Sequence, residues 1–450
     1  MNVERNEHGN YNLLRIIFAE NKNTLTGGVK AMRKNDNRQV EKRQRITEAT
    51  LIVGMDIGCE FNAMCLMNKE GTVLGRYPKI YNSRKGFDYF HTIIEKTKKK
   101  NTLSAVLIGM EPTGHYWRKV AFFAMDKDYK VRFVRTTALK HQRELDESSS
   151  SKNDVRDAYT IANIVREGKY IDTVIEDGVF RQLRSLAHTR ERIQRISTGA
   201  KHALKGVLED YFPELKNIFW SMKAKGLRAL LTRCPFPEDV LTITPDTLTE
   251  IIAKSTRRKT KAREKAKQIY EAARQSVGLK SIGEADRYRV TTYLSEITYS
   301  EAQLKEIELH MKTLLQKIPL AEYILSIPGI GVITCGVFLG ELGNPSHFTD
   351  PKQIVKYAGY DPQEHDSGQR TGRKTISKKG RWLLRKYLYF MAMRAVHRSP
   401  FFKEYYENKQ KTMKKKEALC AVAIKLIKVI FALLRDKRMF TEKSCLAQAA

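Results

Sequence analysis

Apolar runs of two different periods divide the first third of the chain into strands and helices. In chain order they predict strands over residues 51–58, 62–67 and 72–81, a helix over 87–98, a strand over 105–110, a helix over 115–126 and a strand over 131–135. The first three strands form a meander joined by a glycine turn. The order β-β-β-α-β-α-β predicts an α/β domain with a mixed sheet.

The helix that follows, from Asp154 to Gly168, places two acids on its apolar side. Its stripe at helical spacing consists of Ala158, Ile161, Ala162 and Val165. Asp154 and Asp157 fall on the same stripe, so both carboxylates are predicted to point toward the buried side. A buried carboxylate takes up a proton or lies beside a cation, and Mg²⁺ prefers carboxylate oxygens. The simpler interpretation is that both acids only cap the helix and favour its positive end.

Two further acids end predicted strands. Asp56 stands at the end of the first strand, within Gly-x-Asp-x-Gly, and Glu111 follows the strand over 105–110. Sites of open α/β sheets collect at this edge. Taken singly, Asp56 is equally a strand-ending acid and Glu111 equally the start of a turn. Together with Asp154 and Asp157 they supply four carboxylates, enough to hold two divalent ions about 4 Å apart for phosphoryl transfer.

The middle of the chain, from about residue 180 to 318, is predicted to be mostly helical. Two stretches carry apolar residues at alternating steps of three and four: Ile193, Ile196, Ala200, Ala203 and Val207, and then Leu304, Ile307, Met311, Leu314 and Ile318. We expect these stretches to form an antiparallel pair or a dimerisation arm. Prolines divide the segment between them into short helices, and the basic run 257–261 is either a solvated helix face or a phosphate contact.

A Pro-Gly-Ile-Gly turn at residues 328–331 separates two predicted helices. In a helix-hairpin-helix the N–H groups of Gly329 and Gly331 would face a phosphate at a helix start. The other interpretation is a tight turn between helices with no ligand.

Ser367 lies in an Asp-Ser-Gly segment close to many cations. These cations are Arg370, Arg373, Lys374, Lys378, Lys379 and Arg381. They would stabilise a pentavalent phosphate if Ser367 attacked one, although Asp-Ser-Gly is also ordinary turn chemistry. The segments 382–394 and 414–434 are predicted to be amphipathic helices that pack.

Charge gives the clearest indication of a partner. The 450 residues include 82 Lys and Arg and 50 Asp and Glu, which gives a formal net charge of +32. Hydrophobic residues make up 42% of the chain, enough to form hydrophobic cores. This surplus indicates a polyanionic partner, above all nucleic acid. No stretch is apolar enough to span a bilayer, so no membrane partner is expected. The six cysteines show no Cys-x-x-Cys pair, which favours reduced thiols in a cytoplasmic protein.

In combination these motifs resemble one family. The chain resembles the bacterial insertion-sequence transposases that have a four-acid (DEDD) RuvC-like domain and a C-terminal serine-containing transposase domain. The motifs that carry this resemblance are Gly54–Gly58, Glu111–Tyr116, Lys152–Ala158, Pro328–Gly331, and Ser367-Gly368 followed by 376–380. The family is related to Piv-type DNA invertases and includes bridge-RNA-guided recombinases. The resemblance covers about residues 51–435. Asn153 departs from it, because threonine or serine is more usual there.

The resemblance implies a fold and a mechanism. Asp56, Glu111, Asp154 and Asp157 would bind Mg²⁺ (or Mn²⁺), and Ser367 would attack DNA and form a transient phosphoserine link. The implied partners are double-stranded DNA at the element ends and target, a structured guide RNA, and further copies of the chain in a dimer or tetramer. A bacterial, cytoplasmic and nucleoid-associated location is expected.

The domain organisation expected on this basis has four parts. Residues 1–50 form a basic arm, or stand upstream of the true start; 51–178 form an α/β RNase-H-like (RuvC-like) domain; 179–320 form a helical, coiled-coil linker; and 321–440 form a mainly α C-terminal domain with the helix-hairpin-helix and the serine loop. Two other functions remain open: a RuvC-like, Mg²⁺-dependent junction-resolving nuclease that ignores Ser367, and a catalytically inactive nucleic-acid-binding protein.

Overall fold

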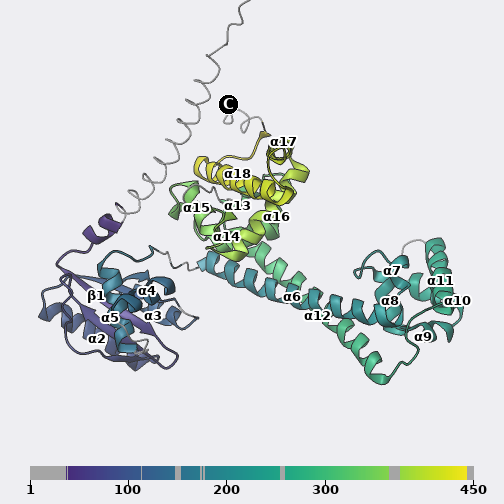
Figure 1. Cartoon of the computed structure of the whole chain (residues 1–450), viewed down its shortest axis with the longest axis horizontal. Helices are drawn as coiled ribbons and strands as arrows, with labels where there is room; N and C mark the ends of the chain where they lie inside the picture. The colour runs from purple at the N-terminus through teal and green to yellow at the C-terminus, as the bar shows by residue number, and fades with distance from the viewer. Residues whose placement is uncertain are drawn as a thin grey trace, which may run out of the picture. The chain divides into compact units, whose positions relative to one another are not determined.

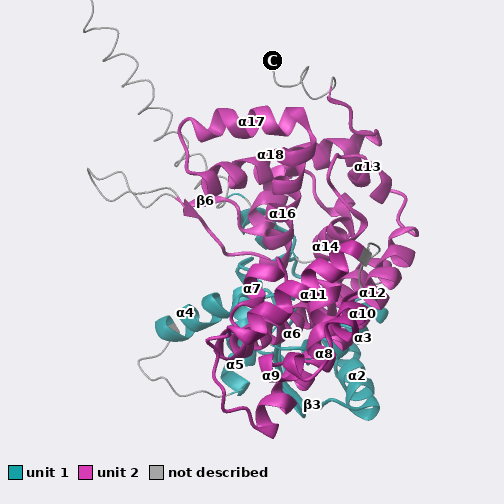
Figure 2. Cartoon of the chain, turned by 90° about the vertical axis from the view of Figure 1, so that its right-hand side faces the viewer, with its two compact units in different colours: residues 1–174 teal, residues 175–450 magenta. Residues whose placement is uncertain are grey.

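The structure is a computed structural model that describes residues 37, 39–112, 114–146, 154–172, 175, 178–253, 259–363 and 375–442. The chain forms two compact units, residues 1–174 and residues 175–450 (Figure 2). Figure 1 labels their helices and strands. Within the described residues, no helix is both long and apolar enough to cross a membrane.

Unit 1 is built on a five-stranded mixed sheet. Its strands are β1 (Thr50–Ile57), β2 (Phe61–Met67), β3 (Lys79–Tyr81), β4 (Ala105–Met110) and β5 (Lys130–Phe133), in the spatial order β3-β2-β1-β4-β5. β1 pairs antiparallel with β2 and parallel with β4, and β4 pairs parallel with β5. The predicted order of elements is therefore confirmed, and the sheet is compatible with an RNase-H-like α/β domain.

The third strand is much shorter than the predicted 72–81. Only Lys79–Tyr81 pairs with β2 as a ladder, and Val73 forms a single bridge with Met67. Gly75 adopts a positive φ of 103°, which turns the chain out of an extended course. Pro78 has no N–H to donate to a ladder. The alternation of side chains over 72–81 is typical of a strand, but Gly75 and Pro78 interrupt the pairing with β2.

Helical residues 39–44 precede the sheet, and the helices α2 (Arg84–Lys100), α3 (Trp117–Asp126), α4 (Thr136–Asp146) and α5 (Asp154–Arg166) accompany it. The sequence patterns predicted α2, α3 and α5 but not α4. Leu139 is the one large apolar residue of α4 that is fully buried, so this helix shows almost no apolar period. It packs against α5, where Leu139 joins a core with Ile161 and Val165.

Two glycines let α5 lie directly on the central strands. Gly54 of β1 and Gly109 of β4 are partners in the parallel register. A Cβ added at Gly54 would lie 2.1 Å from the carbonyl oxygen of Ala158, and one at Gly109 would lie 2.2 Å from a methyl of Val165. Any side chain at either position would push the helix away. The predicted apolar stripe of α5 is fully buried in this contact.

Unit 2 contains two long antiparallel helices, α6 (Gly178–Tyr211) and α12 (Glu284–Leu315), which run side by side (Figure 1). Leu183 near the start of α6 shares a core with Met311 near the end of α12, whereas Val207 shares a second core with Val290. The antiparallel pair predicted from the sequence is thus confirmed, while a coiled coil remains a prediction.

Two positions in the predicted seam of α6, Ile196 and Ala203, were wrong, and Leu204 is buried where Ala203 was predicted. Ile196 is 46% exposed, and Ser197 is buried instead. The buried positions of α6 step by four and three through Ile193, Ser197, Ala200, Leu204 and Val207. The prediction followed hydrophobicity and assigned Ile196 to the seam. The helical phase set by Ile193 and Ala200 instead places Ser197 there. Around the far end of this pair lie short helices: α7 (Leu215–Ile218), α8 (Lys225–Arg233), α9 (Pro237–Leu241), α10 (Pro245–Ala253) and α11 (Lys259–Arg274).

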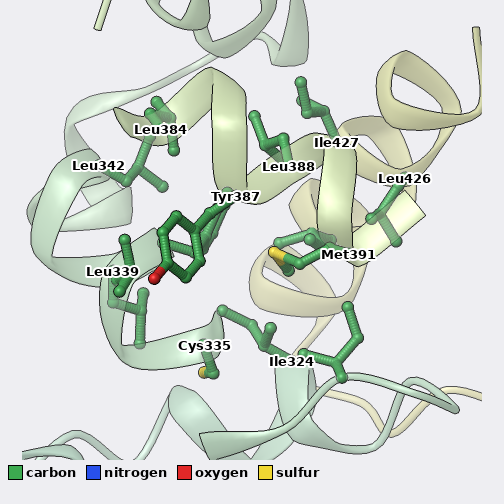
Figure 3. Packing of buried hydrophobic residues seen from close by; sticks show 14 of the residues in the cluster. Ile324, Cys335, Leu339, Leu342, Leu384, Tyr387, Leu388, Met391, Leu426 and Ile427 are labelled. Carbon is green, nitrogen blue, oxygen red and sulfur yellow. The ribbon is translucent and has the colours of Figure 1, made fainter. Parts of the chain in front are cut away.

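The C-terminal part of unit 2 is mainly helical, as predicted. Its elements are α13 (Ala321–Leu325), α14 (Val332–Leu342), the 3-10 helix η1 (Pro345–His347), α15 (Pro351–Ala358), β6 (Pro362–Gln363), β7 (Thr375–Ile376), α16 (Trp382–Arg398), α17 (Pro400–Gln410) and α18 (Lys415–Asp436). Their shared core includes Leu339, Leu388 and Ile427 (Figure 3). This core also receives the first turns of α6, which fixes the long helix pair to the C-terminal part.

Candidate active site

Asp56 and Glu111 occupy neighbouring positions at one edge of the sheet of unit 1. Met55 and Met110 are partners in the parallel register of β1 and β4, so Asp56 and Glu111 are the next residues of each strand. Side chains alternate between the two faces along a strand. Gly54 and Gly109, two positions earlier, face α5. Asp56 and Glu111 therefore project on the side of the sheet that α5 covers, at the carboxyl ends of both strands.

The N-terminus of α5 points to this same edge. Its C-terminal end lies beside the chain that leads into β1, because a Cβ at Gly168 would lie 2.8 Å from the carbonyl oxygen of Gln39. Its first half lies over Gly54, toward the end of β1. The helix thus runs antiparallel to β1. Its first turn, with Asp154 and Asp157, is directed toward the strand ends that carry Asp56 and Glu111.

The two acids of α5 differ in burial. Asp157 is 2% exposed, as predicted, and its Oδ2 lies 2.5 Å from Nη2 of Arg143 in an ion pair. Asp154 is exposed, so the prediction that both carboxylates face the buried side was wrong for this residue. The buried face of α5 begins at Asp157 and Ala158, and Asp154 lies on the first turn, before that face begins.

Arg143 is a residue of this site that the sequence patterns missed. It follows the buried Leu139 by four positions in α4, so it lies on the helix face that packs against α5. This spacing was available in the sequence. It had no meaning, however, until α4 itself was recognised as a helix. Arg143 supplies the cation that a buried carboxylate requires.

The carboxylates suit a divalent metal in kind. Asp56, Glu111 and Asp157 offer the hard oxygen ligands that Mg²⁺ prefers, and they come from neighbouring elements at one edge. Glu111 and Asp157 are buried, where an ionised carboxylate needs a cation. In the part of the chain that the structure describes, however, no three His, Cys, Asp or Glu side chains lie close enough together to hold a metal ion. In the structure, the cation beside Asp157 is Arg143.

The serine candidate and three of its cations fall on a segment that lies outside the described residues: Ser367, Arg370, Arg373 and Lys374. The short antiparallel strands β6 and β7 bound this segment, with Pro362 opposite Ile376. The hydroxyl of Ser377 hydrogen-bonds the Asp361 carboxylate across the same hairpin. Both ends of the serine segment are therefore held side by side.

The cations after β7 have different roles in the structure. Lys378 and Lys379 are exposed. Arg381, in contrast, donates to the carbonyl oxygen of Glu341 and lies 4.6 Å over the ring of Tyr357. Its guanidinium therefore helps to hold the fold. Glu341 itself is buried. Burial raises its pKa, but the hydrogen bond with His188 and the charges of Arg184 and Arg381 together outweigh burial, so the pKa of Glu341 lies below its usual value.

The glycine turn at 328–331 joins α13 to α14, as predicted. Gly329 has φ of +87°, and a Cβ there would lie 2.6 Å from the carbonyl oxygen of Arg394 in α16. Glycine is thus required at 329 for packing alone. Gly331 is exposed, precedes α14, and its N–H donates to Oγ1 of Thr334. Phosphate binding at these glycines, and the helix-hairpin-helix itself, remain predictions.

Comparison with known families matches both parts of the chain described above. Residues 53–213, which include Asp56, Glu111, Asp154 and Asp157, match a family described as transposase, the DEDD transposases of IS110 type. Residues 321–407, which include the glycine turn and the β6–β7 hairpin, match the transposase IS116/IS110/IS902 family.

Individual relatives agree with this assignment. The chain is 24% identical over 71% of its length to an uncharacterised 43.6 kDa protein of insertion element IS110 from Streptomyces coelicolor, covering 79% of that protein. It is 27% identical over 66% of its length to an uncharacterised 44.8 kDa protein of IS116 from Streptomyces clavuligerus, covering 75% of it. It is also 31% identical to the pilin gene-inverting protein of Moraxella bovis, over 27% of this chain and 39% of that one. The chain belongs to the IS110 family of DEDD transposases, enzymes that cleave and rejoin DNA.

Proposed function

We propose that this transposase excises and inserts a mobile element by strand exchange that requires a divalent metal and passes through a phosphoserine. The neighbouring positions of Asp56 and Glu111, with the first turn of α5 directed toward them, carry the proposal. An RNase-H-like sheet with carboxylates at this edge is suited to phosphoryl transfer. The basic composition, with a net charge of +32, fits a DNA substrate.

In this proposal Asp56, Glu111, Asp154 and Asp157 hold Mg²⁺ or Mn²⁺. The metal would polarise the scissile phosphate and neutralise its developing charge. Asp157, now paired with Arg143, would be one of the residues that hold the metal, and the Arg143 guanidinium would then be available to pair with a phosphate. Asp154, exposed on the first turn of α5, would contribute its carboxylate from the outer side of the same helix end.

Ser367 acts as the nucleophile. Its hydroxyl oxygen attacks a phosphorus atom, the bond between that phosphorus and one deoxyribose oxygen breaks, and the released oxygen takes a proton. One phosphoester replaces another, so the link can be passed to a new DNA end without another energy source. Lys378 and Lys379, together with Arg370, Arg373 and Lys374, would stabilise the additional negative charge of the transition state.

The substrates follow from the same proposal. The enzyme would act on double-stranded DNA at the element ends and the target, as a dimer or tetramer, with a structured RNA that pairs with both. The exposed cations of the C-terminal part support nucleic-acid binding, and Gly329 and Gly331 would contribute backbone contacts to phosphate. The relation to a pilin gene-inverting protein supports the recombinase reaction rather than hydrolysis.

The test uses Ser367→Ala in a cell carrying the element with its native flanks. Junction formation should be lost, whereas DNA binding should stay within about twofold, because the hydroxyl is needed only for chemistry. After denaturation, wild-type protein should carry covalently attached DNA and the variant should not. Ser346→Ala, an exposed serine of the same unit, serves as the matched control.

Two results would contradict the proposal. A Ser367→Ala variant that still forms junctions, with free 3′-hydroxyl and 5′-phosphate ends and no attached protein, would favour a junction-resolving nuclease that uses metal-activated water. Binding without any cleavage by the wild-type protein, with or without Mg²⁺, would favour an inactive nucleic-acid-binding protein.

A further inference from the structure

Helix α16 presents an outer face whose rings are only partly covered by contacts within the chain. Its inner residues, among them Leu384, Leu388 and Met391, point into the core of unit 2 (Figure 3). The outer residues follow at steps of three and four, which places them on one face: Trp382, Arg385, Lys386, Tyr389 and Phe390. We name these five residues the aromatic face. A surface helix normally carries polar residues there.

Exposure of the rings is substantial. Trp382 is 42% exposed and Phe390 is 37% exposed, two turns apart on the same face of the helix. Large apolar side chains grouped on a surface mark an interaction site more often than scattered ones do. The exposed rings therefore make the aromatic face a candidate interaction surface for a ligand that stacks on aromatic side chains.

A hollow of about 310 Å³ lies against this face. Tyr360, Ile376 of β7 and Cys420 of α18 complete its lining. Tyr360 is 1% exposed, and its hydroxyl donates to the carbonyl oxygen of Arg385 at 3.0 Å. The volume is at the lower limit for small-molecule sites, about 300 Å³, which suits one planar ring system.

Hydrogen bonds fix the hollow to the hairpin that bounds the serine segment. Nη1 of Arg385 donates to the carbonyl oxygens of Ala358, at 2.9 Å, and Lys378, at 3.2 Å. These two carbonyls stand on the two sides of the β6–β7 hairpin. The hollow is thus built onto the base of the hairpin, and Arg385 holds both of its sides.

Cations surround the aromatic rings. The guanidinium of Arg195 lies 4.9 Å over Trp382, and Lys386 lies 5.9 Å from the ring centre of Phe390. Glu191 of α6 is buried beside these cations. It forms ion pairs with Lys386, at 2.6 Å, and with Arg195, at 3.4 Å. Lys378 and Lys379 add exposed positive charge nearby in the chain.

Rings among cations form the kind of surface that binds unpaired nucleic acid, because bases stack on the rings while phosphates contact the cations. We propose that the hollow beside the aromatic face accepts one unpaired nucleobase of the DNA strand, stacked on Trp382. DNA is the occupant because the family cleaves and rejoins DNA. That the bound base lies next to the cleaved DNA bond rests on the proposed function of Ser367. The binding of the base itself does not depend on it.

A seated base would position the strand. Extraction of a base from a duplex is unfavourable, and the stacking contacts would offset part of that cost. The strand on either side of the base is then held in one register relative to the hairpin. Trp382 is in this sense a positioning residue, since it does not contact the reacting phosphate.

The experiment measures equilibrium binding of a short single-stranded DNA by fluorescence anisotropy, with full-length protein in EDTA and in the Ser367→Ala background, so that no strand is cut. Trp382→Ala should weaken binding about 5- to 150-fold, the range for loss of one stacked base. Trp382→Tyr should retain most of the affinity. Trp220→Ala is the matched control, because Trp220 is 101% exposed in the same unit but does not line the hollow.

A second measurement reports on the base itself. An abasic site moved along the DNA should reproduce the loss at one position, and Trp382→Ala should then cause no further loss. The proposal is overturned if Trp382→Ala binds intact DNA as tightly as Trp220→Ala does. It is also overturned if the variant only changes the oligomeric state in size-exclusion chromatography, or weakens binding of an RNA strand alone. Because no cleavage is involved, these outcomes are independent of whether Ser367 is the nucleophile.

Discussion

At the scale of single residues, the ion pair between Arg143 and Asp157 is the contact that most directly concerns metal binding. Asp157 is a buried acid on α5, and Arg143 reaches it from α4. A guanidinium and a divalent ion are alternative partners for the same carboxylate. The pair therefore stabilises the site as it stands and would compete with the proposed metal for Asp157.

Replacing Arg143 by Gln should lower the stability of the metal-free protein by about 1–3 kcal/mol, because Asp157 keeps a buried charge without its cation. Mg²⁺ should then restore more stability to this variant than it adds to the wild type. Thermal unfolding in EDTA and again in Mg²⁺ measures both effects.

Arg132→Gln is the control for Arg143→Gln, since it breaks a more exposed pair, with Asp172, that includes none of the four candidate carboxylates. Its loss should stay below about 1 kcal/mol and should not respond to the metal. Equal gains from Mg²⁺ in both variants would show that Arg143 and the metal do not share Asp157.

At the scale of elements, Glu301 of α12 joins three helices at the far part of the long helix pair. It accepts hydrogen bonds from Arg228 of α8, at 2.6 Å, and from Lys201 of α6, at 2.8 Å. The hydrogen bond from Arg228 has the largest effect on the pKa of Glu301. Burial raises this pKa, but the hydrogen bonds and charges of Arg228 and Lys201 outweigh burial and lower the pKa to about 2. The short helices are thereby attached to the pair by a shared charge.

Since the folded-state pKa of Glu301 is depressed, its contribution to stability is present above the unfolded pKa of 4.5 and is lost as pH falls toward about 2. At pH 7, Glu301→Gln should cost about 1–2 kcal/mol, with allowance for solvent screening. The difference from wild type should shrink below pH 4.5. Urea unfolding along a pH series, with hydrogen exchange in α8 as the local probe, tests this.

Glu209→Gln is the control for Glu301→Gln, because Glu209 makes only an exposed pair with Lys205 in the same helix as Lys201. A Glu301→Gln variant whose stability matches that of Glu209→Gln at pH 7 would contradict the structural role of the triad.

The same elements show what the sequence could predict. Helices and strands with a strong apolar period, such as β4 and α5, were predicted with nearly correct bounds. Helix α4 was missed because its contact with α5 depends on Leu139 alone, and with it Arg143 was missed. Ile196 was assigned to the wrong face because hydrophobicity outweighed helical phase.

The candidate site was predictable only in part. Acids at strand ends indicated the carboxylate edge, since register and alternation follow from the strands themselves. The exposure of Asp154 and the pairing of Asp157 depend on where α5 begins and what packs beside it, which one sequence does not specify. The sequence predicted that α16 only packs, because Trp382 and Phe390 are residue types typical of cores. The structure shows that the opposite face of the helix is the buried one.

At the scale of the whole molecule, a net charge of +32 is spread over both units, so DNA binding should depend strongly on salt. A protein that contacts 6–10 phosphates loses roughly 10³–10⁵ in affinity between about 50 and 200 mM salt. Stacking on Trp382, in contrast, releases no counterions. Trp382→Ala should therefore lower affinity by the same factor at every salt concentration, whereas Lys379→Ala should reduce the slope of log K against log salt by about 1.

Binding isotherms of the three proteins over a salt series separate these two contributions. Parallel lines for wild type and Trp382→Ala, with a shallower line for Lys379→Ala, are expected. A shallower slope for Trp382→Ala would mean that the tryptophan acts through Arg195, whose guanidinium lies over its ring, by holding that cation against a phosphate. The hollow would then be a phosphate contact and not a place for a base.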